Sequence, residues 1–191
     1  MRAMEENRSQ DIESKETKIH TGSAAHGWRE MIAGDLPRVL TIADKCHPDH
    51  PEDEAVFRER LALFPSGCSV LESDGHIVGY LICHPYLFGR PVDLNSLLGK
   101  IPSNTDVIYI HDVSIDLGMR GQGLASEAVS HAKQLARKSG FGKLALVAVN
   151  HSQPFWAEHG FVRISDDLID QALSRYGIAS SYMVCELEYT A

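Results

Sequence analysis

The chain has 191 residues, of which 43% are hydrophobic and 23% charged, and its formal net charge is −8. This length is typical of one globular domain with a substantial core. The negative charge argues against nucleic acid or an anionic membrane surface as the main partner, and it is compatible with a cationic substrate. No apolar run approaches the roughly 20 residues that span a bilayer, and the N-terminus lacks the apolar stretch of a signal peptide.

The four cysteines, Cys46, Cys68, Cys83 and Cys185, are scattered and form no Cys-x-x-Cys pair. This spacing does not indicate a disulfide framework or a structural zinc site. We therefore expect a reducing, cytoplasmic setting and no metal cofactor. Three of these thiols fall in expected strands and are interpreted as inert core residues.

Residues 1–27 are polar and charged without periodicity, which is typical of a disordered tail. We expect a single domain over residues 28–191, beginning with a short strand over 28–32. Asp35 suits the N-cap of a following helix, and Pro37 is tolerated in its first turn.

A break at residues 46–51 separates this helix from a second amphipathic helix over 56–64. His47 and His50 lie three residues apart in the break, which invites a metal-binding interpretation. Each histidine is followed directly by a proline, Pro48 or Pro51, and no third metal ligand is nearby in the sequence. A plain loop is therefore the favoured interpretation.

Two strands, at residues 68–72 and 77–84, are predicted next, joined by a tight turn at Asp74-Gly75. The connection over 85–106 contains three prolines, two glycines and a short leucine-rich patch, and we expect one helical turn within it. Long connections in compact domains are often functional, so this one is a candidate substrate entrance.

The most informative stretch begins with an apolar-rich strand at residues 107–115. A glycine-containing turn at 120–125 follows, and then a helix that extends to Lys138. A strand, a glycine-rich turn and a helix N-terminus together can hold phosphate, because unpaired N–H groups and the helix dipole favour negative charge. The uninterrupted apolar run at 144–149 is typical of a strand buried on both faces.

The C-terminal part is expected to contain a short helix with Pro154 in its first turn and Gly160 at its end. A strand at 161–164, a helical segment at 169–176 and a last strand at 183–189 with alternating apolar residues follow. The element order predicts an α/β fold, with a mixed sheet that is antiparallel in its front half and has a parallel pair near the middle.

The glycine turn alone does not identify its ligand. A dinucleotide-binding fold requires G-x-G-x-x-G after the first strand, whereas only Gly121 and Gly123 occur here, after the fourth strand. A P-loop requires Gly-Lys-Ser or Gly-Lys-Thr, which is absent.

The chain resembles the GNAT superfamily of acyl-CoA-dependent N-acetyltransferases over roughly residues 28–190. The resemblance is carried by Arg120–Ala125 with its preceding strand, by the buried strand ending at Asn150, and by Phe155–Phe161, which is similar to the family's "FYE-x-x-GF" segment. It implies a mostly antiparallel sheet with helices on both faces and a central parallel pair splayed for acetyl-CoA.

The resemblance implies that the turn N–H groups bind the pyrophosphate, while the pantetheine lies beside the strand before the turn. Two interpretations remain for the Arg120 side chain, a contact to phosphate and an exposed helix cap. Two also remain for Asn150 and Ser152, a contact to CoA and a helix cap. The cofactor-binding residues implied are Val113, Ser114, Ile115, Arg120, Gly121, Gln122, Gly123, Leu124, Ala125, Asn150, Ser152 and Trp156.

Within the superfamily the chain looks most like the arylalkylamine (serotonin-type) N-acetyltransferases and their bacterial relatives, whose "HLHVL" strand corresponds to residues 109–113. His111 falls on the second histidine and is the main catalytic candidate, because imidazole can take a proton from an amine near neutral pH. A structural histidine is the alternative. Tyr109 replaces the first histidine, either as a proton relay or as a cleft wall. Asp112 should face the opposite side unless a bulge shifts the alternation.

Trp156 falls where the family usually has a tyrosine that protonates the departing thiolate. An indole N–H is not a general acid at ordinary pH, so Trp156 is interpreted as packing against the cofactor. The thiolate must then receive its proton from another group or from water, or leave unassisted.

The function predicted is direct acetyl transfer from acetyl-CoA to a primary amine in a ternary complex, with an arylalkylamine as first choice and a polyamine as second. Alternatives are a non-catalytic acyl-CoA sensor on the same fold, a protein or peptide N-acetyltransferase, and a nucleotide-binding domain. A small-molecule amine, rather than nucleic acid or a membrane, is the expected partner, and a homodimer is left open.

Overall fold

The computed structural model describes residues 26–177 and 180–188. Most of the expected tail, residues 1–25, lies outside the described residues. The first strand begins at His26, two residues before the expected start of the domain. The strands are β1 (His26–Glu30), β2 (Cys68–Ser73), β3 (His76–Tyr86), β4 (Val107–Ile115), β5 (Lys143–Ala148), β6 (Val162–Arg163) and β7 (Ser181–Glu186). The α-helices are α1 (Leu36–Cys46), α2 (Glu54–Leu63), α3 (Leu124–Lys138), α4 (Gln153–Glu158) and α5 (Asp167–Leu173).

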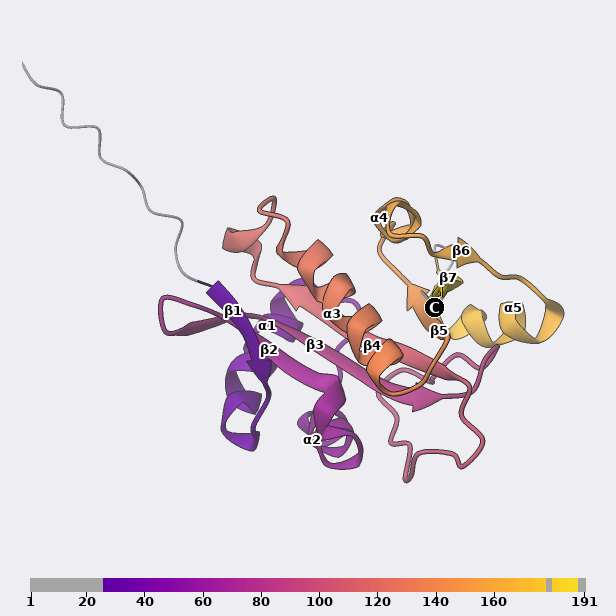
Figure 1. Cartoon of the computed structure of the whole chain (residues 1–191), viewed down its shortest axis with the longest axis horizontal. Coiled ribbons are helices and arrows are strands. Elements are labelled where there is room, and N and C mark those ends of the chain that lie inside the picture. The colour runs from indigo at the N-terminus through magenta and orange to yellow at the C-terminus, as the bar shows by residue number, and fades with distance from the viewer. Residues whose placement is uncertain (1–25, 178–179, 189–191) are drawn as a thin grey trace, which may run out of the picture.

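The seven described strands form one sheet in the order β1-β2-β3-β4-β5-β7-β6 (Figure 1). All neighbouring pairs are antiparallel except β4 and β5, which confirms the predicted mixed sheet. The parallel pairing is short, because only Ile108 with Leu144 and Tyr109 with Ala145 are in register. Beyond these residues β4 and β5 separate, which leaves backbone groups of both strands available to a ligand.

Helices cover both faces of the sheet (Figure 1). On one face α3 packs Val129, Ala132 and Ala136 against the central strands, together with Trp156 of α4. The opposite face is covered by α1 and α2 over β2 and β3, and by α5 over β4, β5 and β7. Each helix is thus held by an apolar stripe at helical spacing, as the sequence pattern predicts.

Two local details differ from the expectations. Asp35 is at the N-cap position of α1, as expected, but its side chain does not cap that helix; the carboxylate accepts the N–H of Ile32 at 2.9 Å and pairs with Arg29 at 2.7 Å, at the end of a 3-10 turn. The connection after β3 contains turns but no helical turn. It is tied to α2 instead, where Glu59 accepts the N–H groups of Leu98 at 2.7 Å and Gly99 at 2.9 Å.

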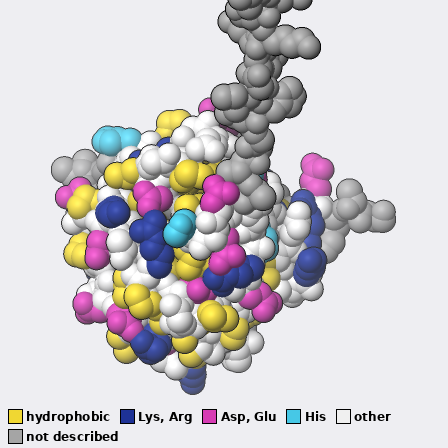
Figure 2. Space-filling view, turned by 90° about the vertical axis from the view of Figure 1, so that its left-hand side faces the viewer, with side chains coloured by type: hydrophobic (Ala, Val, Ile, Leu, Met, Phe, Trp, Pro, Cys, Tyr) yellow, Lys and Arg dark blue, Asp and Glu magenta, His cyan; other side chains and the backbone are white. Residues whose placement is uncertain are grey.

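The end of the molecule that carries β1 has an interspersed surface charge. Figure 2 shows basic and acidic side chains mixed on this face, where Arg29 pairs with Asp35 and with Glu72. Neighbouring charges of opposite sign offset one another here, so this face offers no single-sign field to a charged partner. Within residues 26–177 and 180–188, no helix combines the length and apolarity needed to cross a membrane.

Candidate active site

A β-bulge in β4 sets the direction of the candidate catalytic side chains. Ile82 of β3 is opposite Asp112, whereas the next residue, Cys83, is opposite Ile110, so His111 has no partner in the ladder. The extra residue directs both His111 and Asp112 to the face that carries α1 and α2. The expectation from strict alternation, that Asp112 faces the other side, is therefore wrong, and the bulge is the reason.

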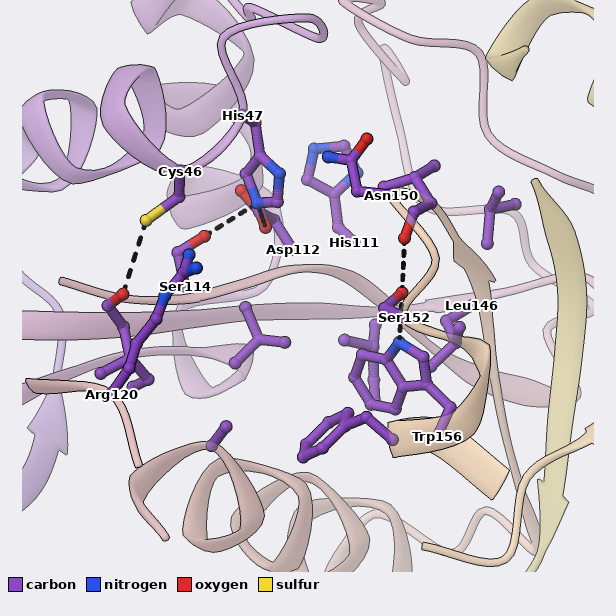
Figure 3. Close-up of a pocket in the computed structure, with 17 residues that line it drawn as sticks. Cys46, His47, His111, Asp112, Ser114, Arg120, Leu146, Asn150, Ser152 and Trp156 are labelled. Carbon is purple, nitrogen blue, oxygen red and sulfur yellow. Dashed lines mark hydrogen bonds and ion pairs between the residues drawn. The ribbon is translucent and has the colours of Figure 1, made fainter. Parts of the chain in front are cut away.

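A cavity of about 340 Å³ lies where β4 and β5 separate (Figure 3). β4, the start of α3, the end of β5, α4 and the loop after α1 all contribute side chains to it. The predicted site residues that line it are His111, Val113, Ser114, Ile115, Arg120, Ala125, Asn150, Ser152 and Trp156. Cys46, His47 and Asp112 also line the cavity. No motif in the sequence assigned these three residues to a site.

The glycine turn forms a second hollow of about 300 Å³ that shares Arg120 and Ala125 with the cavity and adds Gly121, Gly123 and Leu124. Gly121 and Gly123 have φ values of 80° and 81°, a conformation that favours glycine. In the part of the chain that the structure describes, the N–H groups of residues 121–125 have no hydrogen-bond acceptor. The positive end of the α3 dipole therefore faces an open hollow. The Gln122 amide lies near Met119 Sδ, at 3.9 Å, rather than in either space.

His111 is held by a carboxylate that the sequence analysis missed. Its Nε2 lies 2.8 Å from Glu52 Oε2, and the two side chains are 6% and 9% exposed. Burial raises the pKa of Glu52, but the charge and hydrogen bond of His111 and the Asn95 N–H outweigh it, so the pKa is lowered overall. An ionised carboxylate only accepts hydrogen bonds, so Nε2 donates to Glu52, and in the neutral ring the free lone pair is on Nδ1.

The free Nδ1 of His111 is open to the cavity. Among the described residues it has no hydrogen-bond partner, yet it is not one of the buried unpartnered atoms, which are Trp28 Nε1, Arg60 Nε and His84 Nε2. It therefore keeps accessible surface. This arrangement can accept a proton from a molecule in the cavity.

A second histidine, His47, lies in the same cavity beside His111 (Figure 3). Its Nε2 is 3.1 Å from Asp112 Oδ1 and 2.8 Å from Ser114 Oγ, and the hydroxyl of Tyr80 donates to the same carboxylate. Burial raises the pKa of Asp112, but the hydrogen bond and charge of His47 and the Tyr80 hydroxyl lower it more, so this carboxylate is ionised. The plain loop expected at residues 46–51 thus supplies a side chain to the site.

A small pocket of about 70 Å³ adjoins the cavity and shares His47, His111 and Asp112 with it. Glu52 and Asp93 add two further carboxylates. The remaining lining residues are largely apolar or aromatic: His50, Leu94, Tyr109, Val147, Val149 and Tyr176. The pocket therefore combines negative charge with an apolar wall, a combination that suits a cationic group on an apolar stem.

Tyr109 forms part of that wall. The residue is 2% exposed, its ring stacks on His84, and its hydroxyl accepts the Val92 N–H at 3.5 Å. Burial raises the pKa of Tyr109 well above its ordinary value. These contacts favour Tyr109 as part of the pocket wall over Tyr109 as a proton relay to solvent.

Trp156 lies at the opposite end of the cavity from the two histidines (Figure 3). Its indole Nε1 donates to Ser152 Oγ at 3.2 Å, and that hydroxyl donates to the Val149 carbonyl at 2.6 Å. Both donors are therefore already used. Within the described residues no group of three or more His, Cys, Asp or Glu side chains is arranged to hold a metal ion.

Comparison with known proteins identifies the fold. The chain is similar in structure to Ard1 from Thermoplasma volcanium (16% identity, 86% of this chain and 99% of that chain covered, TM-score 0.65). It is also similar to the loading GNATL domain of CurA from Lyngbya majuscula (15%, 85% and 98%, TM-score 0.70). The N-acetylglutamate synthase from Neisseria gonorrhoeae, complexed with coenzyme A and L-arginine, matches as well (20%, 87% and 34%, TM-score 0.62). At these identities the likeness establishes the fold alone.

Among curated proteins, none matches the sequence. A family model described as "Acetyltransferase (GNAT) family" matches residues 30–161, which is more than half of the chain. This span runs from the end of β1 to the residue after Gly160, and it includes the glycine turn, both separated strands and His111. The chain therefore belongs to the GNAT family of acetyltransferases.

Proposed function

We propose that this protein transfers an acetyl group directly from acetyl-CoA to a primary amine in a ternary complex. The observation that carries the proposal is His111, whose Nε2 is bound by Glu52 at 2.8 Å while its Nδ1 is open to the cavity between β4 and β5. His111 borders both the cavity and the small pocket beside it. With the thioester in the cavity and the amine in the small pocket, a general base at this position can reach both.

In this proposal the glycine turn binds the pyrophosphate of acetyl-CoA. The unpaired N–H groups of residues 121–125 and the α3 dipole support it, and Arg120, which borders both hollows, adds a positive charge. The pantetheine then lies along Val113–Ile115, between the separated strands. Asn150, Ser152 and Trp156 border the same space from the end of β5 and from α4.

The amine enters the small pocket, where the carboxylates of Glu52, Asp93 and Asp112 favour an ammonium ion. The ammonium ion first releases one proton to water, and the neutral nitrogen then attacks the thioester carbonyl. As the C–N bond forms, the nitrogen loses a second proton to His111 Nδ1, directly or through water. Backbone N–H groups near Val113 stabilise the charge that develops on the carbonyl oxygen. The C–N bond forms, the C–S bond breaks, and CoA leaves as a thiolate.

An arylalkylamine is our first choice of acceptor and a polyamine the second. The wall formed by Leu94, Tyr109 and Tyr176 supports an apolar or aromatic stem beyond the amino group. The carboxylates of the pocket support any amine, and a second ammonium group would compete with Arg175 for Asp93, the carboxylate with which Arg175 pairs. The resemblance of residues 109–113 to the "HLHVL" strand also supports an arylalkylamine.

The proposal is tested by incubating the protein with acetyl-CoA and a panel of aryl-substituted amines, diamines and N-terminal peptides. CoA release and the mass of the acetylated product are measured. We expect at least one small amine to raise CoA release well above the rate without amine. If acetyl-CoA binds but no amine raises turnover, the protein is an acyl-CoA sensor; if only peptides respond, it is a peptide N-acetyltransferase.

A further inference from the structure

The proposed function leaves one proton unassigned. The departing CoA thiolate must be protonated, and the indole N–H of Trp156 cannot serve as the acid. The Ser152 hydroxyl already donates to the Val149 carbonyl at 2.6 Å. The remaining ionisable side chains at the cavity, besides His111, are Cys46, His47, Asp112 and Arg120. Asp112 is an acceptor, and a guanidinium does not release its proton in proteins.

We propose that His47 is the general acid that protonates the CoA thiolate, an inference that rests on the proposed acetyl transfer. The histidine borders both the cavity and the small pocket. Its Nε2 is fixed by Asp112 Oδ1 at 3.1 Å and Ser114 Oγ at 2.8 Å. Its Nδ1 has no partner among the described residues and keeps accessible surface, so this is the nitrogen that can deliver a proton into the cavity.

Cys46 is the rival donor at the same place, and its contacts argue against it. Its Sγ donates to the Ile115 carbonyl at 3.5 Å, so the S–H points into the strand backbone (Figure 3). Once such a thiol has given up its proton, no neighbouring group is placed to return a proton to the sulfur. His47, in contrast, has an ionised carboxylate behind it, which stabilises the imidazolium.

The charged groups around His47 favour its protonated form. Burial lowers the pKa of His47, and the positive charge of Arg120 lowers it further. The hydrogen bond and charge of Asp112, together with the charge of Glu52, outweigh both, and the pKa is raised overall. His47 therefore keeps its proton to higher pH than an ordinary histidine does, as an acid needs, and acid and base are separate histidines.

The step balances in protons and bonds. The Nδ1–H bond of His47 breaks and an S–H bond forms on CoA, which leaves His47 as a neutral imidazole held by Asp112. The ammonium ion that enters releases one proton to water before it attacks, and the attacking nitrogen loses its second proton to His111 as the C–N bond forms. Afterwards His47 takes a proton from water and His111 releases one to water, and both rings return to their starting states.

The test compares His47→Gln with His76→Gln, since His76 is an exposed histidine at the start of β3, far from the cavity in the sheet. Steady-state kcat is measured against pH, and acetyl-CoA affinity is measured by calorimetry. We expect His47→Gln to lower kcat by about 10² to 10⁴-fold while acetyl-CoA affinity stays within about twofold. The fall of kcat at alkaline pH, where the acid loses its proton, should disappear in this variant only. In Asp112→Asn the same fall should move to lower pH.

The two proposals fail in different ways. If the wild-type protein acetylates an amine and His47→Gln keeps its kcat or its alkaline fall, the assignment of His47 is overturned and the proposed function stands. If the wild-type protein acetylates nothing, both are overturned. An NMR titration of the wild-type histidine rings gives a readout that needs neither turnover nor a variant. His47 should titrate above about 6.5, the ordinary histidine value, and titration below it overturns the assignment.

Discussion

At the scale of single residues, the site consists of two histidines that are each bound at Nε2 by a different carboxylate. Glu52 does more than hold His111, because its second oxygen accepts the N–H of Asn95 at 2.9 Å. The same side chain thus ties the connection after β3 to the candidate base. A fixed ring orientation matters, since a base that rotates loses alignment with the proton it must accept.

We predict that Glu52→Gln lowers kcat/KM for the amine by about 10 to 100-fold, less than the 10² to 10⁴-fold that a general base contributes. An amide side chain removes the charge and can turn its N–H₂ toward His111, which would favour the wrong tautomer. Glu54→Gln is the matched control, because Glu54 is exposed at the start of α2 and pairs only with Arg58. Equal kcat/KM in the two variants would contradict the role given to Glu52.

The residue scale is also where sequence information is weakest. His111 could be identified because its neighbours in the chain form a recognisable strand. Glu52 and His47 could not, since they meet their partners across 59 and 65 residues respectively. Neither contact leaves a local pattern. The local pattern at His47, which is followed by Pro48 and Pro51, even favours an ordinary loop.

At the scale of elements, the separation of β4 from β5 and the turn before α3 are the features that matter. The turn was predictable because its requirements are local: left-handed backbone at two positions and the N-terminus of an amphipathic helix. The bulge at His111 was not fixed by the sequence pattern. The bulge depends on the register in which β4 pairs with β3. A shift of one residue in that register decides whether Asp112 lies on the same face of the sheet as His47 and His111.

We predict that Gly123→Ala weakens acetyl-CoA binding and destabilises the fold by about 1–2 kcal/mol. Gly123 has a φ of 81°, and an added Cβ would meet no atom within 4 Å, so the cost is backbone strain rather than a clash. Relief of that strain would redirect the N–H groups of the turn. Gly118→Ala is the control, since Gly118 is equally open and lacks a positive φ. Affinity and melting temperature should change in the first variant only.

At the scale of the whole molecule, the layered sheet brings five separate parts of the chain to one place. The loop after α1, the strand β4, the turn before α3, the end of β5 and the start of α4 all border the same cavity. The family and the sheet topology could be predicted, because they depend on element order and apolar periodicity. The acceptor pocket could be predicted only in part: the 85–106 connection is a candidate entrance by its length and supplies Asp93 and Leu94, whereas Tyr176 comes from a 3-10 turn with no periodic pattern.

The proposed acetyl transfer depends on proton transfer to His111, and the variant His111→Gln tests this step directly. With the amine that gives the fastest CoA release, kcat/KM is measured for the wild-type protein and the variant, and acetyl-CoA affinity is measured for both. We predict a loss of about 10² to 10⁴-fold in kcat/KM, with acetyl-CoA affinity unchanged within about twofold. A variant that binds acetyl-CoA normally and acetylates the amine at the wild-type rate would contradict the assignment of His111 as the base.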